Sequence, residues 1–271
     1  MIVVIRIIMV LLCSVLISAE SIDSFRYRAN YMIKQQWNHA DIKAEVEFGR
    51  RLTAKLLAQY PLLDDNRVQR YVNLLGQGIV AMVGRADIHY YFSVIESDHI
   101  NAYAAPGGYV MVTTGLLKHC QNEAQLVGVL AHEISHINRR YIVEKFNIRG
   151  DDGAMLDTVG IVIGGSTQTS RLALDGVVSQ VMDMLLMDGL DQDEELMADQ
   201  EAVQFMGALN YDWREYRDLV GQIEGDHHSE SVSKTHPSSN DRQQMMQLSV
   251  INHQISGQYV KKDRFKEYVP F

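Results

Sequence analysis

The stretch "VLAHEISHIN", residues 129–138, carries His132 and His136 four positions apart, with Glu133 directly after the first histidine. Four residues of an α-helix turn the chain by about 400°, so the two imidazoles lie one turn apart on nearly one face. Two rings placed in this way can bind one metal ion. Glu133 lies about 100° further round the helix, where it can reach a water on the metal without being a ligand. The stretch therefore predicts a zinc-binding helix that carries its own base.

A solvated helical cluster that binds no metal is the alternative, because five-residue motifs recur by chance. The surrounding segment "LVGVLAHEISHI", residues 126–137, is however apolar. Its polar groups would be buried without partners unless they bind something. We therefore expect zinc to acidify a water and polarise a carbonyl, while Glu133 takes the proton and passes it to the leaving amine. The predicted reaction is metal-assisted hydrolysis of a peptide bond.

Two histidines are too few to hold a metal firmly, so a third ligand is needed from another helix. The segment "EELMAD", residues 194–199, offers Glu195, with Asp199 four residues later on the same face and the small Ala198 between them. Asp199 could accept the free ring N–H of a ligating histidine and so fix its orientation. Other carboxylates in the same segment are expected to be solvated in the first helical turn, where they complement the helix dipole: Glu194, Asp193 and Asp191.

The composition is that of a soluble globular protein, with 46% hydrophobic and 22% charged residues among 271. A net charge of −9 leaves no basic surface for phosphate backbones, which excludes nucleic acid as an expected partner. Of the two cysteines, Cys13 falls in the N-terminal segment, and Cys120 is expected to be a buried small hydrophobe. We predict a single zinc metalloprotease domain over residues 20–271.

The N-terminal segment has the layout of a secretory signal peptide over residues 1–19. Arg6 precedes an apolar run over residues 7–17, and small residues follow it at Ser18 and Ala19. Cleavage is expected after Ala19, which would place the mature chain in the periplasm or outside the cell. An uncleaved membrane anchor is the alternative, although the apolar run is short for a bilayer.

The apolar pattern predicts a mainly helical α+β fold with a small antiparallel sheet beside the zinc-binding helix. Two strands, "IHYYFSVI" and "GYVMVTTG", are expected to flank a loop, "SDHINAYAAPGG". Methionines 182, 184 and 187 form a stripe that is expected to be core or to line an adaptable groove. Helices are expected over residues 41–60, 65–83, 122–145 and 193–210, and Asp64 and Asp65 offer an N-cap for the second of them.

Four blocks in this order resemble the HtpX-like and BepA-like zinc endopeptidases, relatives of the CAAX prenyl proteases. The blocks are "NAYAAPGGYVMVTTGLL", "LVGVLAHEISH", "EELMAD" and "THPSSNDR", and the resemblance covers about residues 41–248. It implies a gluzincin-type metalloprotease fold. It also implies that zinc is bound by His132, His136 and Glu195, with Glu133 as the base.

The resemblance further implies that the strand at residues 108–113 pairs with the substrate backbone. An edge strand can add an extended peptide through main-chain hydrogen bonds, which gives affinity with little sequence selectivity. The residues expected to bind substrate are Asn101, Ala102, Gly108, Tyr109, Val110 and Met111.

The block "THPSSNDR" places His236 and Arg242 where members of the family keep a histidine and an arginine near the metal. His236 could stabilise the oxyanion, or it could occupy the fourth position on zinc and shut the enzyme off. A surface histidine before Pro237 is the simpler alternative.

The predicted function is that of a secreted or periplasmic zinc endopeptidase in protein quality control, acting on unfolded or misassembled envelope proteins. A peripheral association with the membrane stays open. The alternative is a catalytically silent, zinc-containing chaperone or assembly factor of the envelope. Glu133 argues against that alternative, because a structural zinc site needs no base and normally takes four protein ligands.

Overall fold

The computed structural model describes residues 37–150, 161–163, 168–224 and 236–270. The predicted signal peptide and its cleavage site lie outside these ranges. Within them, no helix combines the length and the apolar character needed to cross a bilayer.

A three-stranded sheet lies at the centre of the fold. Its strands are β1 (Tyr91–Ile95), β2 (Ala102–Ala105) and β3 (Tyr109–Thr113), in the order β1-β3-β2. β3 runs parallel to β1 and antiparallel to β2, so the prediction of an antiparallel sheet is wrong and the sheet is mixed. Residues 102–105, expected in a loop, form a hairpin with β3 and take one of its edges. β1 therefore pairs with the other edge.

The hairpin turn between β2 and β3 depends on two glycines. Gly107 and Gly108 have φ values of 76° and 101°, a region that other residues rarely adopt. A Cβ on Gly108 would also lie 1.9 Å from the carbonyl oxygen of His89. The turn "PGG" therefore sets where β3 begins.

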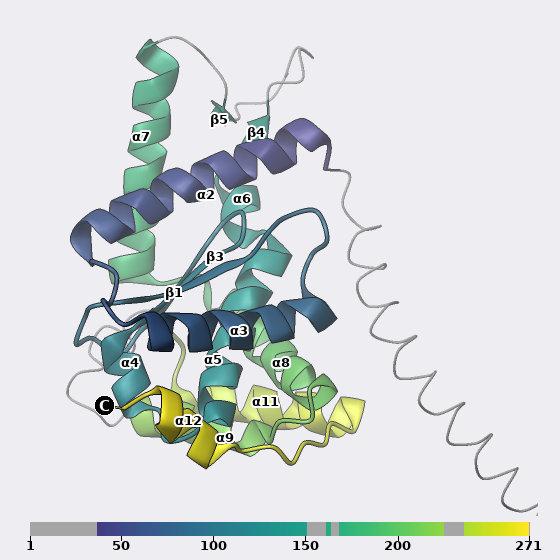
Figure 1. Cartoon of the computed structure of the whole chain (residues 1–271). Coiled ribbons are helices and arrows are strands. Elements are labelled where there is room, and N and C mark those ends of the chain that lie inside the picture. The colour runs from purple at the N-terminus through teal and green to yellow at the C-terminus, as the bar shows by residue number, and fades with distance from the viewer. Residues whose placement is uncertain (1–36, 151–160, 164–167, 225–235, 271) are drawn as a thin grey trace, which may run out of the picture.

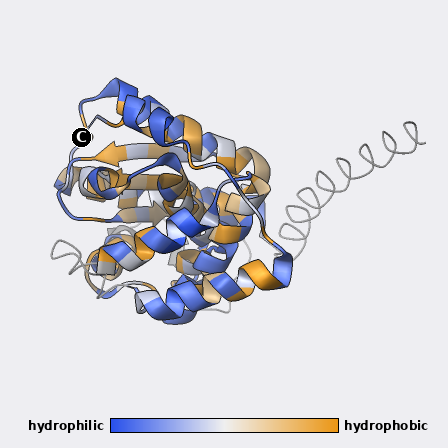
Figure 2. Ribbon diagram, turned by 90° about the horizontal axis from the view of Figure 1, so that it is seen from below, coloured by the Kyte–Doolittle hydropathy of each residue, from blue (hydrophilic) through white to orange (hydrophobic). Residues whose placement is uncertain are grey.

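Helices cover both faces of the sheet, as Figure 1 shows: α2 (His39–Gln59) lies above it, and α3 (Asn66–Val83) and α5 (Glu123–Arg139) lie below it. Val110 and Val112 of β3 pack into the apolar cluster with α3 and α5, whereas Met111 packs into the cluster with α2. Successive strand residues point to opposite faces, and both faces are buried here. This explains the unbroken apolar run of β3, and Figure 2 shows the strands mostly orange between helices with blue outer faces.

Side-chain caps determine where the main helices begin. Asp65 accepts hydrogen bonds from the backbone N–H groups of Arg67 and Val68 at the start of α3, which confirms the predicted cap. Asn122 accepts from the N–H of Gln125 at 3.1 Å at the start of α5. Such caps satisfy N–H groups that have no partner within the helix.

The single helix predicted for residues 122–145 is wrong, because the chain breaks at Arg140. This residue has a φ of 55° and separates α5 from α6 (Tyr141–Lys145). The break lets the Arg140 side chain turn inward, where it lies 2.5 Å from Asp87 and 3.3 Å from Glu45. A buried ion cluster thus explains why the helix ends.

Of the remaining helices, α8, α9, α11 and α12 complete the layer below the sheet, whereas α6 and α7 lie on the side of α2 (Figure 1). Met182 and Met184 are buried as expected for core, whereas Met187 is 68% exposed. The other elements are α4 (Thr114–His119), β4 (Ile148–Gly150), β5 (Ile161–Ile163), α7 (Gln168–Asp183), the π-helix η1 (Met184–Asp188), α8 (Gln192–Ala208), α9 (Trp213–Glu224), α11 (Ser239–His253) and α12 (Lys262–Tyr268).

Candidate active site

The packing of α8 against α5 brings three of the predicted ligands together. Ala198 of α8 is fully buried, and its small side chain lets the two helices approach closely. His132 Nε2 lies 3.0 Å from His136 Nε2 and 3.3 Å from Glu195 Oε2. His136 Nε2 lies 3.5 Å from Glu195 Oε1. Two imidazoles and one carboxylate therefore converge on one point.

The spacing and the protonation of these groups fit a divalent metal ion. Ligand bonds of 2.0–2.1 Å in a tetrahedral zinc site place neighbouring ligand atoms about 3.3 Å apart, as they are here. His132 Nδ1 lies 3.0 Å from Asp199 Oδ1, so its proton belongs to that contact and Nε2 presents a lone pair. Glu195 Oε2 is buried and has no hydrogen-bond donor within the described residues. A divalent cation between these atoms would bind the lone pairs that face each other.

His236 lies at the same point. Its Nε2 is 3.2 Å from Glu195 Oε2, and candidate ligand atoms of His132, Glu195 and His236 all lie within 4.8 Å of one another. The side chain is 18% exposed, so the alternative of a surface loop histidine is wrong. This position suits a fourth ligand.

Asp199 supports His132 from behind. Its carboxylate is fully buried, and it accepts hydrogen bonds from Arg242 at 2.7 and 2.8 Å and from the Tyr216 hydroxyl at 2.7 Å. Burial opposes ionisation, but the Arg242 guanidinium and His132 hold the pKa of Asp199 well below its usual range. Arg242, expected in the catalytic machinery, thus acts through Asp199 and positions His132.

Glu133 lies beside the converging ligands and is 7% exposed. Burial raises the pKa of its carboxyl to about 7, which suits a group that takes and returns a proton near neutral pH. It lines two small cavities. Leu185 and Leu190 line one of them, and a larger set of apolar side chains lines the other.

β2, not β3, borders the site. β3 pairs with β1 on one side and β2 on the other, so it has no free edge for a peptide, and the prediction of an edge strand at residues 108–113 is wrong. This removes the basis for assigning Gly108, Tyr109, Val110 and Met111 to substrate. β2 is an outer strand of the sheet, and Asn101 and Ala102 line both cavities beside Glu133.

Several residues of the candidate site are not predicted by the sequence. Tyr216 was visible only as one aromatic residue in "YDWREY", with no spacing that linked it to Asp199. Leu185 and Leu190, from η1 and the turn after it, line the same cavity as residues of β2. Glu194, expected to be solvated, binds Arg139 at 2.9 Å. Asp191 is exposed, as expected, and forms a surface ion pair with Lys145.

Replacement of Asp199 by asparagine is expected to destabilise the protein by about 3 kcal/mol, because the buried Arg242 guanidinium would lose its counter-charge. The affinity for metal should also fall about 10–100-fold, since His132 would lose its orienting acceptor. Denaturant unfolding and a zinc titration measure the two effects. Tyr216→Phe is the matched control: it removes one donor to Asp199 but no charge, so an equal loss in both variants would contradict this role.

The site defines a class of protein. Two histidines one turn apart on one helix, with a glutamate between them and a carboxylate from a second helix, are the arrangement of a metallopeptidase. The chain belongs to peptidase family M48, whose model matches residues 66–248. The predicted resemblance is therefore confirmed.

Curated relatives agree with this family. The chain is 28% identical over 176 residues to the beta-barrel assembly-enhancing protease of Escherichia coli K12, covering 63% of this chain and 36% of the relative. It is 35% identical over 101 residues to the protein of that name from Yersinia pestis, covering 37% and 21%. It is 39% identical over 75 residues to the mitochondrial metalloendopeptidase OMA1 of Schizosaccharomyces pombe, covering 28% and 22%. The chain thus spans about a third or less of the length of these relatives.

Proposed function

We propose that this chain is a zinc-dependent endopeptidase that hydrolyses unfolded or misassembled proteins of the cell envelope. The observation that carries the proposal is the convergence of His132, His136 and Glu195 beside the buried Glu133. The substrate class is supported by the names of the relatives, among them a beta-barrel assembly-enhancing protease.

The residues divide the chemistry between them. A zinc ion held by His132, His136 and Glu195 would polarise the scissile carbonyl and acidify water. Glu133 accepts a proton from the attacking water and returns it to the leaving amine. Asp199 keeps His132 in the tautomer whose Nε2 is free to bind metal. The outer edge of β2 would orient an extended peptide through main-chain hydrogen bonds.

An apolar cavity next to Glu133 supports a preference for substrates with a large apolar residue at the cleavage site. The cavity also touches His132 and Arg242, and its wall consists of Ile100, Leu116, Val129, Leu219, Val220 and Ile223. Burial of a leucine-sized side chain there would contribute about 1.5–3 kcal/mol. Mass spectrometry of casein fragments is expected to show Leu, Ile, Val or Phe enriched on one side of the cut bonds. An even distribution would contradict the preference.

His236 is proposed to occupy the fourth metal position in the resting protein. Its Nε2 lies 3.2 Å from Glu195 Oε2, a separation that suits two ligand atoms of one zinc ion. His236→Ala is then expected to raise the rate of casein hydrolysis several-fold, because water and substrate would meet no competing ligand. A lower rate would instead assign His236 to the oxyanion, and an unchanged rate would exclude both roles. His253→Ala, at the exposed end of α11, is a control for the loss of an imidazole elsewhere.

The proposed location is the periplasm or the cell exterior, after cleavage behind Ala19. The motivating observation is the signal-peptide layout of residues 1–19. Mass spectrometry of the protein from its native host should find Glu20 as the first residue. An intact N-terminus in the membrane fraction would favour the membrane-anchored alternative.

A further inference from the structure

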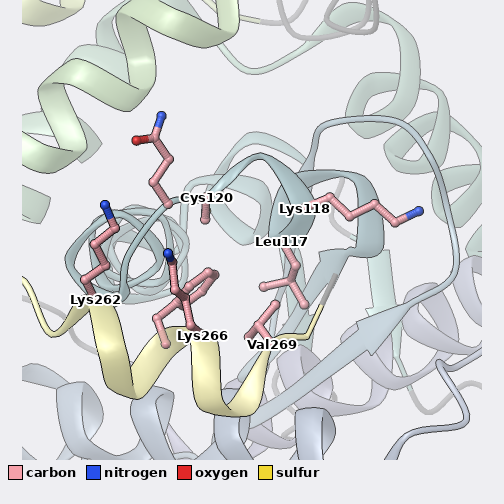
Figure 3. A pocket seen from close by; sticks show the side chains of 8 residues that line it. Leu117, Lys118, Cys120, Lys262, Lys266 and Val269 are labelled. Carbon is pink, nitrogen blue, oxygen red and sulfur yellow. The ribbon is translucent and has the colours of Figure 1, made fainter.

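A second cavity lies between α4 and α12, apart from the candidate metal site. Its volume is about 260 Å³, close to the lower limit of small-ligand sites. Leu117, Cys120, Phe265 and Val269 are almost fully buried and line it. Figure 3 shows these side chains together with the lysines around them.

The helix α12 is held firmly against the rest of the fold. Arg264 donates to the buried Glu123 at 2.6 Å, and the ring of Tyr268 stacks on Tyr71 with centroids 4.9 Å apart. These contacts fix one side of the helix. Lys262, Lys266 and Val269, which follow the helical spacing of four and three residues, line the cavity on another side.

The lysines of the cavity differ in what they contact. Lys118 pairs with Asp98 at 3.2 Å, and in Figure 3 its amino group points away from Lys262 and Lys266. Those two are exposed and have no ion-pair partner within the described parts of the chain. Like charges four residues apart destabilise a helix, and here they stand out in a chain of net charge −9. Two neighbouring ammonium groups beside an apolar floor are complementary to an anion joined closely to an apolar group.

We propose that this cavity binds the free carboxyl terminus of a polypeptide whose last residue is apolar. The carboxylate would lie between Lys262 and Lys266, and the last side chain would cover Phe265 and Val269. In a terminal residue, the carboxylate and the side chain branch from one Cα, and the two lysines and the apolar residues line one cavity. A fatty acid would place most of its apolar chain beyond a cavity of this volume.

The position of the cavity suggests what such binding would do. Leu117 lines it, whereas the preceding Leu116 lines the apolar cavity beside Glu133. The two cavities therefore lie against different faces of α4, and a captured terminus would tether its chain near the candidate active site. Only this last step, and the choice of a polypeptide as ligand, rest on the proposed function.

The test measures binding to the whole chain carrying Glu133→Gln, so that its outcome does not depend on hydrolysis. A fluorescent peptide ending in Ala-Leu with a free carboxylate is titrated by anisotropy, next to its C-terminal amide. Loss of the charge is expected to weaken binding at least tenfold, as for other charged hydrogen bonds. The double variant Lys262→Ala/Lys266→Ala should weaken binding of the free peptide equally, and Lys118→Ala should not.

A peptide carboxylate could also bind at the candidate metal site. The lysine variants show whether the peptide binds in the cavity between α4 and α12 instead. Equal affinity of the double variant and its parent would overturn the proposal, even if amidation weakens binding. Equal affinity for the peptide and its amide, or no binding at millimolar peptide, would also overturn the proposal. Displacement of the peptide by decanoate at a lower concentration than by acetyl-leucine would overturn it too, because it would favour a fatty acid as the ligand. A wild-type chain that fails to cut casein but shows the lysine-dependent binding would refute the proposed function alone.

Discussion

The Glu133→Gln variant is expected to lose hydrolysis of casein by about 10²–10⁴-fold in kcat/KM, the range that a general base contributes. Glutamine has the same shape but cannot accept the proton of the attacking water. Zinc stoichiometry should be unchanged, because Glu133 lies beside the three ligands and is not one of them. Hydrolysis of labelled casein and metal analysis of the same preparation measure both quantities.

Glu47→Gln is the control for that experiment, since Glu47 is a partly exposed glutamate on α2 whose partners are Arg50 and Arg51. It should keep the full rate. Unchanged turnover in Glu133→Gln would refute the mechanism. If the wild-type chain binds zinc and unfolded protein but cuts neither casein nor peptides, the alternative of a catalytically silent chaperone takes its place.

Glu195→Ala is expected to lower the affinity for zinc more than a hundredfold, beyond the 10–100-fold typical of residues that only orient a ligand. The change removes the carboxylate that lies 3.3 Å from His132 and 3.5 Å from His136, and two imidazoles alone hold a metal weakly. Competition with a chromogenic chelator measures the affinity. Loss of hydrolysis should follow the loss of metal.

The neighbouring Glu194→Ala is the matched control. Glu194 precedes the ligand on the same helix, but its carboxylate binds Arg139. Its removal should leave zinc affinity within about twofold of wild type, since it removes no ligand. Stoichiometric zinc in Glu195→Ala would show that the third ligand is misassigned.

Sequence patterns predict those parts of the fold that depend on local rules. The cap at Asp65 is one example, because a short acidic side chain before a helix accepts hydrogen bonds from N–H groups two and three residues later. The pairing of His132 with His136 is another, since helical spacing alone brings the rings together. The pairing of Glu195 and Asp199 with that helix could also be predicted, because a second helix carries two carboxylates on one face with a small residue between them.

Other parts depend on contacts between distant segments. β2 has the sequence Ala-Tyr-Ala-Ala, whose alanines have low strand propensity, so its pairing comes from β3 and not from its own residues. The break at Arg140 depends on carboxylates of Glu45 and Asp87, far away in the chain. Tyr216 reaches Asp199 only because α9 packs against α5. No local pattern predicts contacts of this kind.

Anomalous diffraction at the zinc edge, from crystals of the whole chain, would locate the metal ion and identify its ligands. We expect one zinc peak bonded to His132 Nε2, His136 Nε2 and the Glu195 carboxylate at about 2.0–2.2 Å. A peak at another place, or a Glu195 carboxylate that does not contact the ion, would contradict this expectation.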